Sequence, residues 1–149
     1  MKSLPVSVRR LPHAADLALP ARQSAHAAGV DLLAAVDAPV EISPGAFARI
    51  PTGVAIALPE GHEAQVRPRS GLSAKHGLFL LNSPGTIDED YRGEIAVLVA
   101  NFGSTPFRVE RGLRIAQLVV SPVARVEWRE VPELPPTDRG AGGFGSTGA

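Results

Sequence analysis

The sequence predicts an all-β domain built as a sandwich or a barrel, and three observations support that prediction. Glycine and proline recur every few residues, 15 and 14 times in 149 positions, so few windows can hold a long helix. The segments between them are short and apolar, and several alternate with the period of a strand. Turn signals separate the segments, as is typical of sandwiches and barrels. These signals lie at 44–46, 59–62, 102–105 and 110–112.

The expected strands follow one another along the chain, with one short helix among them. The helix is expected over SGLSAKHG, residues 70–77. The last strand run is the longest and contains Trp128, which is expected in the core or at an interface. The strand runs are 5–11, 29–36, 40–43, 47–58, 63–68, 77–82, 94–102, 107–110 and 114–131.

Length and composition limit the class of protein. We expect one β domain over residues 1–136, followed by a flexible glycine-rich tail over 137–149. Fifteen basic and 15 acidic residues give zero formal net charge, which disfavours a nucleic-acid binder. The absence of cysteine excludes disulfides and thiol chemistry. Without an apolar signal region or a run of about 18 apolar residues, we expect a cytoplasmic protein that does not bind membranes.

An anion site is predicted where the run ending at Pro68 meets the expected helix. Arg69 supplies a guanidinium and Ser70 a hydroxyl, and the backbone N–H groups that follow lie near a helix N-terminus. The alternative interpretation is that Ser70 only caps the helix.

Two polar residues interrupt apolar strand runs. Gln117 lies in RIAQLVV, where an unsatisfied buried amide would cost about 1–3 kcal/mol. It therefore needs either a backbone partner or a ligand oxygen. Asp31 lies in AGVDLLAA, where the simpler interpretation is a carboxylate paired with an arginine such as Arg114.

The stretch GTIDEDYRGE, residues 85–94, places three adjacent carboxylates beside an apolar run. A solvated acidic turn is the simpler explanation. However, Asp88 follows Ile87 and precedes Tyr91 by three residues, and a carboxylate at the edge of an apolar slot can hold water as a general base. The four histidines show no metal-ligand spacing, so we predict no zinc site.

The tail after the second of two adjacent prolines reads TDRGAGGFGSTGA. A disordered end is the simpler interpretation, because such a composition buries little apolar surface. Two of its residues suggest more. Arg139 is suited to grip a phosphate, and Phe144 is suited to stack on a base.

Five short motifs occur in order along residues 28–148: AGVDLLA, RPRSGLS, NSPGTIDEDYRGE, RIAQLVV and RGAGGFGSTG. Each is weak alone, but together they resemble the motifs of the trimeric deoxyuridine triphosphatase (dUTPase) family. The resemblance implies a jelly-roll-like β-barrel or sandwich of the β-clip type. It also implies a homotrimer whose active sites lie between subunits.

The resemblance implies dUTP diphosphatase activity, the hydrolysis of dUTP to dUMP and pyrophosphate. This activity limits uracil incorporation into DNA and supplies dUMP for dTMP synthesis. Asp88 would activate the water that attacks the α-phosphorus, and Tyr91 would pack against the deoxyribose. Mg²⁺ would be bound mostly by triphosphate oxygens and water, with Asp31 acting through water. The other implied substrate-binding residues are Arg69, Ser70, Gly71, Asn82, Gly85, Thr86, Ile87, Gln117, Arg139, Phe144, Gly145, Ser146 and Thr147.

These residues would divide the substrate among them. Asn82 and the backbone of 85–91 would read the uracil edge. The turn at 69–71 would hold the phosphates together with Gln117. The tail would close as a lid, with Phe144 stacked over the base.

Two other functions stay open from the sequence. A dCTP deaminase of the same fold would need a catalytic glutamate in the hairpin, for which Glu89 and Glu94 are the candidates. A non-catalytic β module would bind nucleotides or a partner protein without turnover. The TIDEDY stretch and the glycine-rich tail fit the hydrolase better.

Overall fold

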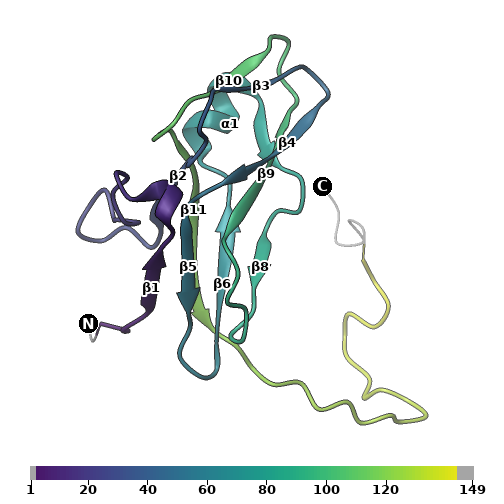
Figure 1. The fold of residues 1–149 in the computed structure, drawn as a ribbon. Coiled ribbons are helices and arrows are strands. Elements are labelled where there is room, and N and C mark those ends of the chain that lie inside the picture. Colours follow the sequence, from purple (N-terminus) through teal and green to yellow (C-terminus); the bar gives the residue numbers. More distant parts are fainter. Residues whose placement is uncertain (1–2, 144–149) are drawn as a thin grey trace.

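A computed structural model describes residues 3–143 of the chain, which form eleven strands, one α-helix and one 3-10 turn (Figure 1). The all-β prediction with one short helix is therefore confirmed. The strands are β1 Ser7–Arg10, β2 Val30–Leu33, β3 Val40–Ile42, β4 Phe47–Pro51, β5 Val54–Ala57, β6 His62–Arg67, β7 Leu78–Leu80, β8 Gly85–Ile87, β9 Ala96–Asn101, β10 Phe107–Val109 and β11 Arg114–Pro122. The 3-10 turn η1 spans Pro12–Ala14, and the helix α1 spans Ser70–His76.

The strands form four small antiparallel sheets. The largest has the order β2-β11-β6-β8, and a second has the order β4-β9-β7. The pairs β1-β5 and β3-β10 complete the set. In Figure 1, β6, β8 and β11 of the largest sheet run side by side along the length of the molecule. The strand β8, which begins the acidic stretch, thus lies at one edge of the largest sheet.

The core is aliphatic and lies between these sheets. Alternate residues of the strands point into it, as the period of two predicts. The strand β9, for example, buries Val97 and Val99 against Ile50 of β4. Asn101 is also buried, and its amide donates to the carbonyl oxygens of Ile42 and Thr105, each at 2.8 Å. A buried amide with its hydrogen bonds satisfied costs little and fixes the loop after β9.

The helix α1 begins one residue earlier than the interpretation of Ser70 as its cap requires. The N-cap position is Arg69, whose side chain makes no capping hydrogen bond, and Ser70 is the first helical residue. The interpretation of Ser70 as a cap is therefore wrong. The helix ends at His76, and the C-cap residue Gly77 has a φ of 66°, a left-handed conformation that glycine adopts without strain. In residues 3–143 no helix has the length and apolar character needed to cross a membrane.

The last predicted strand run is too long. It was expected over 114–131, but β11 ends at Pro122, and residues 122–141 are all exposed. The described chain offers this segment no strand partner, so its alternation of apolar and polar residues forms no ladder. Trp128 is 91% exposed, so of its two expected places, the core and an interface, the core is wrong. Figure 1 shows the chain leaving the end of β11 and running away from the sheets.

Two further differences arise at turns. The run 47–58 divides into β4 and β5 because Gly53 takes a φ of 68° between them. The turn η1, which the sequence reading did not predict, packs on this glycine, where a Cβ would overlap the side chain of Ala14. The N-terminal segment is thereby held against the turn between β4 and β5.

Candidate active site

A cavity of about 270 Å³ opens beside the acidic stretch. Its walls come from β8, from β9, from the residues that follow β8 and from one residue of β4. Apolar side chains form part of the wall, and an amide, a phenol and carboxylates stand among them. The lining residues are Arg49, Asn82, Thr86, Ile87, Asp88, Tyr91, Glu94, Ile95, Ala96 and Leu98. Five of the residues that the sequence singled out are thus brought together here.

The residues from Asp88 to Glu94, which we call the acidic turn, follow β8. The strand ends at Ile87, and the Tyr91 N–H donates to the Asp88 carbonyl oxygen at 3.1 Å, which closes the turn. The Arg92 guanidinium braces it by donating to the carbonyl oxygen of Glu89 at 2.6 Å. Asp88 is exposed and lines the cavity, as a carboxylate that meets water and substrate must.

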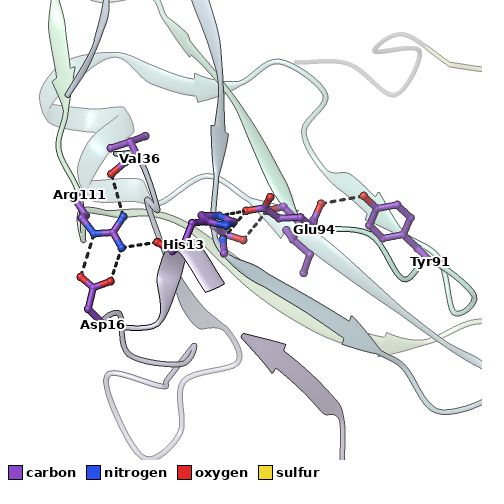
Figure 2. Close-up of polar contacts among 9 residues, drawn as sticks. His13, Asp16, Val36, Tyr91, Glu94 and Arg111 are labelled. Carbon is purple, nitrogen blue, oxygen red and sulfur yellow. Dashed lines mark hydrogen bonds and ion pairs between the residues drawn. The ribbon is translucent and has the colours of Figure 1, made fainter. Parts of the chain in front are cut away.

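Tyr91 is held by the residues that follow it. Its hydroxyl donates to the carbonyl oxygen of Glu94 at 2.9 Å (Figure 2). Its ring lies directly against Gly93, where an added Cβ would overlap both the hydroxyl and the ring. Only glycine leaves room for this ring position. The aromatic wall of the cavity therefore has a fixed place.

The amide of Asn82 lies close to the start of β8. A Cβ on buried Gly85 would stand 3.1 Å from Asn82 Nδ2, so the two residues are in near contact. The Asn82 carboxamide, which lines the cavity, is suited to read a donor and acceptor pattern on a ligand edge.

A second group of predicted residues lies around Asp31. The Asp31 carboxylate, 11% exposed, pairs with Arg69 Nε at 3.1 Å and Arg114 Nη1 at 3.3 Å. Arg69 also donates to the Arg114 carbonyl oxygen at 3.0 Å. The expected pairing of Asp31 with Arg114 is confirmed. Gln117 donates to the carbonyl oxygen of Pro68 at 2.9 Å, so it has the backbone partner that a buried amide needs.

Strand register separates this second group from the cavity. Gln117 lies opposite Arg67, whereas Ile87, which precedes Asp88, lies opposite Ala64. Three residues of a strand span about 10 Å, so the predicted phosphate residues and Asp88 lie toward opposite ends of β6. In the described part of the chain, Arg69, Ser70, Gly71 and Gln117 are absent from the cavity wall. One chain thus forms two incomplete halves of the predicted site.

The tail contributes one described site residue. Arg139 is exposed, and its Nε donates to the Gly142 carbonyl oxygen at 2.8 Å within a local turn. The other four predicted tail residues lie outside the described residues, namely Phe144, Gly145, Ser146 and Thr147.

The side chains of residues 3–143 contain no group of three or more histidine, aspartate or glutamate residues placed to hold a metal ion. The Asp31 carboxylate is engaged by two guanidiniums. The described side chains therefore fit a divalent cation only if the cation arrives with its own oxygen ligands and water.

The sequence reading missed the contacts that hold the acidic turn in place. The Gly53 N–H donates to Glu94 Oε1, and the Gly61 N–H donates to Glu89 Oε2, both at 2.7 Å. His13 Nε2 lies 3.0 Å from the same Glu94 oxygen (Figure 2). Gly61 stands in a turn that the sequence marks, whereas Gly53 lies inside a run that was expected to be one strand. Their partners lie 28 and 41 residues away, which no local pattern reveals.

Comparison with known proteins supplies independent findings. A family model described as dUTPase matches residues 15–148. The dUTPase of Staphylococcus bacteriophage 80alpha with dUpNHpp is 29% identical, with a TM-score of 0.87, 97% of this chain and 99% of that chain being covered. A mutant of the same phage dUTPase, also with dUpNHpp, is 28% identical over the same shares, again with a TM-score of 0.87.

A third solved structure is more distant. It is a mutant dUTPase from phage phi11 of S. aureus, described for the coordination of a structural Mg(II) ion. It is 25% identical and has a TM-score of 0.78, with 89% of this chain and 99% of that chain covered. Together these likenesses confirm the predicted jelly-roll-like fold.

Proposed function

The chain belongs to the dUTPase family and hydrolyses dUTP as a dUTP diphosphatase, and on this basis we propose that Asp88 activates the attacking water. The exposed Asp88 carboxylate at the cavity wall supports this role more directly than any other observation. As the bond from water oxygen to the α-phosphorus forms, a proton passes to Asp88 and the bond to the bridging oxygen breaks. The products are dUMP and pyrophosphate.

The cavity would hold the nucleoside. Asn82 and the backbone of 85–91 would pair with the uracil edge, and a site with fixed donors and acceptors rejects cytosine because the wrong edge leaves polar groups unpaired. The Tyr91 ring, held against Gly93, would pack on the deoxyribose and leave no space for a 2′-hydroxyl. The presence of dUpNHpp, a dUTP analogue, in the phage relative supports this substrate.

The phosphates would be held by Arg69, Ser70, Gly71 and Gln117. The strand positions opposite Gln117 and Ile87 are about 10 Å apart along β6, and the phosphate residues do not line the cavity that contains Asp88. We therefore propose that one subunit supplies the cavity and another supplies the phosphate site. A homotrimer with shared active sites satisfies this requirement. The tail from 137 onward, with Arg139, Phe144, Gly145, Ser146 and Thr147, would close over the substrate.

Mg²⁺ would enter with the triphosphate. When bound, it would shield phosphate charge and fix the geometry for in-line attack. Asp31 would touch it only through water, because its carboxylate already pairs with Arg69 and Arg114. The structural Mg(II) ion of the phi11 phage relative supports the choice of metal.

The cellular role follows from the reaction. Removing dUTP limits uracil incorporation into DNA, and the dUMP formed supplies dTMP synthesis. A cytoplasmic location, expected from the sequence, is part of this proposal.

The deaminase alternative is less well supported. It needs a glutamate free to act on a base, but Glu89 accepts from Gly61 and Glu94 accepts from Gly53. These contacts favour structural roles for both carboxylates. Release of ammonia from dCTP would nevertheless identify a deaminase at once.

A substrate panel tests the proposal. Purified protein is mixed with dUTP, dCTP, dTTP or UTP, with Mg²⁺ or with EDTA, and pyrophosphate release is followed. We expect turnover of dUTP with Mg²⁺, strong discrimination against the other three nucleotides, and loss of activity in EDTA. Equal turnover of dCTP or UTP would contradict the assigned roles of Asn82 and Tyr91.

A further inference from the structure

The two glutamates of the acidic turn bind two glycines at opposite ends of β5. Glu94 Oε1 accepts from the Gly53 N–H just before the strand, and Glu89 Oε2 accepts from the Gly61 N–H in the turn beyond it. We propose that Glu89 and Glu94 are positioning residues that fix the acidic turn on β5. We propose further that Glu94 thereby determines the discrimination between deoxyribose and ribose. The second statement depends on the sugar-packing role proposed for Tyr91.

Both glycines have backbone conformations that turn an N–H group away from the strand ladder. Gly53 has a φ of 68° and Gly61 a φ of 73°, in the left-handed region. A carboxylate that accepts such an N–H makes a charge-assisted hydrogen bond, which is stronger than a neutral one. The two bonds are therefore sturdy anchors for a turn that otherwise projects from a sheet edge.

Glu94 links the hydrogen bond at Gly53 to Tyr91, because its side chain makes one contact and its backbone makes the other. Its carboxylate accepts from Gly53, and its carbonyl oxygen accepts from the Tyr91 hydroxyl at 2.9 Å (Figure 2). The ring has no room to move toward Gly93, which lies directly against it. The position of the ring therefore depends on the position of the Glu94 backbone, which the carboxylate fixes.

The N-terminal segment supports the same carboxylate. His13 Nε2 lies 3.0 Å from Glu94 Oε1, and the His13 carbonyl oxygen accepts from Arg111 at 2.7 Å. Arg111 also donates to the Val36 carbonyl oxygen and pairs with Asp16. Figure 2 shows that these contacts form a connected series from Asp16 through Arg111, His13 and Glu94 to Tyr91.

The two glutamates have different expected effects. Glu89 lies next to Asp88, so its loss is expected to disturb the water-activating carboxylate and lower kcat for every substrate. Glu94 holds Tyr91, so its loss gives the ring freedom to move and makes room for a 2′-hydroxyl. If the two bonds served folding alone, these substitutions would lower the stability of the protein without changing its substrate preference.

The test compares kcat/KM for dUTP and for UTP in Glu94→Ala and Glu94→Gln. Loss of a hydrogen bond to a charged group corresponds to about a tenfold effect or more, so we expect Glu94→Ala to lower the dUTP-to-UTP ratio roughly tenfold. Glu94→Gln keeps an oxygen for the Gly53 N–H and should retain most of the ratio. Glu60→Gln is the matched control, because Glu60 precedes Gly61 and its side chain is 83% exposed.

Two further measurements keep the outcome decisive. Tyr91→Phe removes the hydroxyl that binds the Glu94 carbonyl but leaves the carboxylate, and it should also lower the ratio.

In ¹⁵N-labelled protein, Glu94→Ala should speed hydrogen exchange at the Gly53 amide, and Glu89→Ala should speed it at the Gly61 amide. A wild-type ratio in a folded Glu94→Ala protein, or in Tyr91→Phe if Glu94→Ala does not fold, would overturn the proposal for Glu94. An unprotected Gly53 or Gly61 amide in the wild type would overturn the corresponding anchor. Failure of the wild type to hydrolyse dUTP would instead overturn the proposed function, while the exchange data would still test the anchors.

Discussion

The acidic turn and the terminal segment both carry predicted site residues, but they are held in opposite ways. The acidic turn is tied to β5 by two glutamate–glycine hydrogen bonds and closed by its own backbone. Residues 122–141 are all exposed, and among the described residues the partner of the Arg139 side chain is local, the Gly142 carbonyl oxygen. Chemistry and selectivity need groups fixed in advance, whereas a segment that closes over a substrate must first be open.

Asp88→Asn gives the largest expected effect, because it removes the group for which the turn is held in place. We expect kcat to fall about 10²- to 10⁴-fold while the KM for dUTP changes little, since a general base acts mainly in the transition state. Steady-state kinetics and nucleotide binding to the same protein check this result. A variant that binds dUTP and turns it over normally would remove Asp88 from the mechanism.

Cutting the chain after Thr137 tests the other region. Because the cut keeps every strand and the contacts of Val123 with Gly61 and of Arg125 with Glu60, folding and thermal stability should be nearly unchanged. Turnover should fall on the order of tenfold to a hundredfold, since misplaced substrate and admitted water both slow the reaction. Full activity in the truncated protein would mean that the tail is no lid.

A pair of glycine substitutions sharpens the contrast between the two regions. Gly93→Ala places a Cβ into the Tyr91 ring, and such overpacking typically costs about 1–3 kcal/mol, or roughly a five- to hundredfold rise in KM. Gly140→Ala meets no atom within 4 Å, and although its φ of 50° is left-handed, KM should change less than about twofold. Equal effects of the two substitutions would contradict the difference between the regions.

The smallest expected effect concerns the N-terminal end of the contacts that reach Tyr91. The hydrogen bond from Arg111 lowers the pKa of Asp16 below its ordinary value of 3.8. A carboxylate with a lowered pKa stabilises the fold fully above its unfolded value and loses this contribution as the pH falls through the folded value. The melting temperature of Asp16→Asn should therefore lie slightly below that of wild type at pH 7, and the two should converge as the pH falls below the lowered pKa of Asp16. A difference in melting temperature that persists in acid would mean that the charge of Asp16 is not the source of its stabilising effect.

The strands could largely be predicted from the sequence because their signal is local. Alternation and turn residues located β3, β6, β9 and β10 close to their observed bounds. The prediction failed after Pro122 because alternation continues there although residues 3–143 offer no partner strand. A strand is a property of a pair of segments, and the sequence of one segment shows only half of that pair.

The motifs name residues that line the cavity, but the contacts that position these residues could not be predicted. The resemblance to the dUTPase family pointed to Asp88, Asn82 and Tyr91, and the structure places all three on one cavity. It did not reveal that Glu89 and Glu94 bind the turns on either side of β5. Those bonds join residues 28 and 41 positions apart, and only the folded chain brings them together.

Trp128 is the single tryptophan of the chain, and it stands 91% exposed on the segment beyond β11. In an isolated chain its fluorescence should therefore be that of a solvent-exposed indole. Its emission maximum should stay nearly constant on heating while the β domain unfolds. A blue shift on mixing subunits or adding nucleotide would signal that another surface has covered this ring. The fluorescence of Trp128 therefore does not report unfolding of the β domain, but it does report the binding of another surface to the terminal segment.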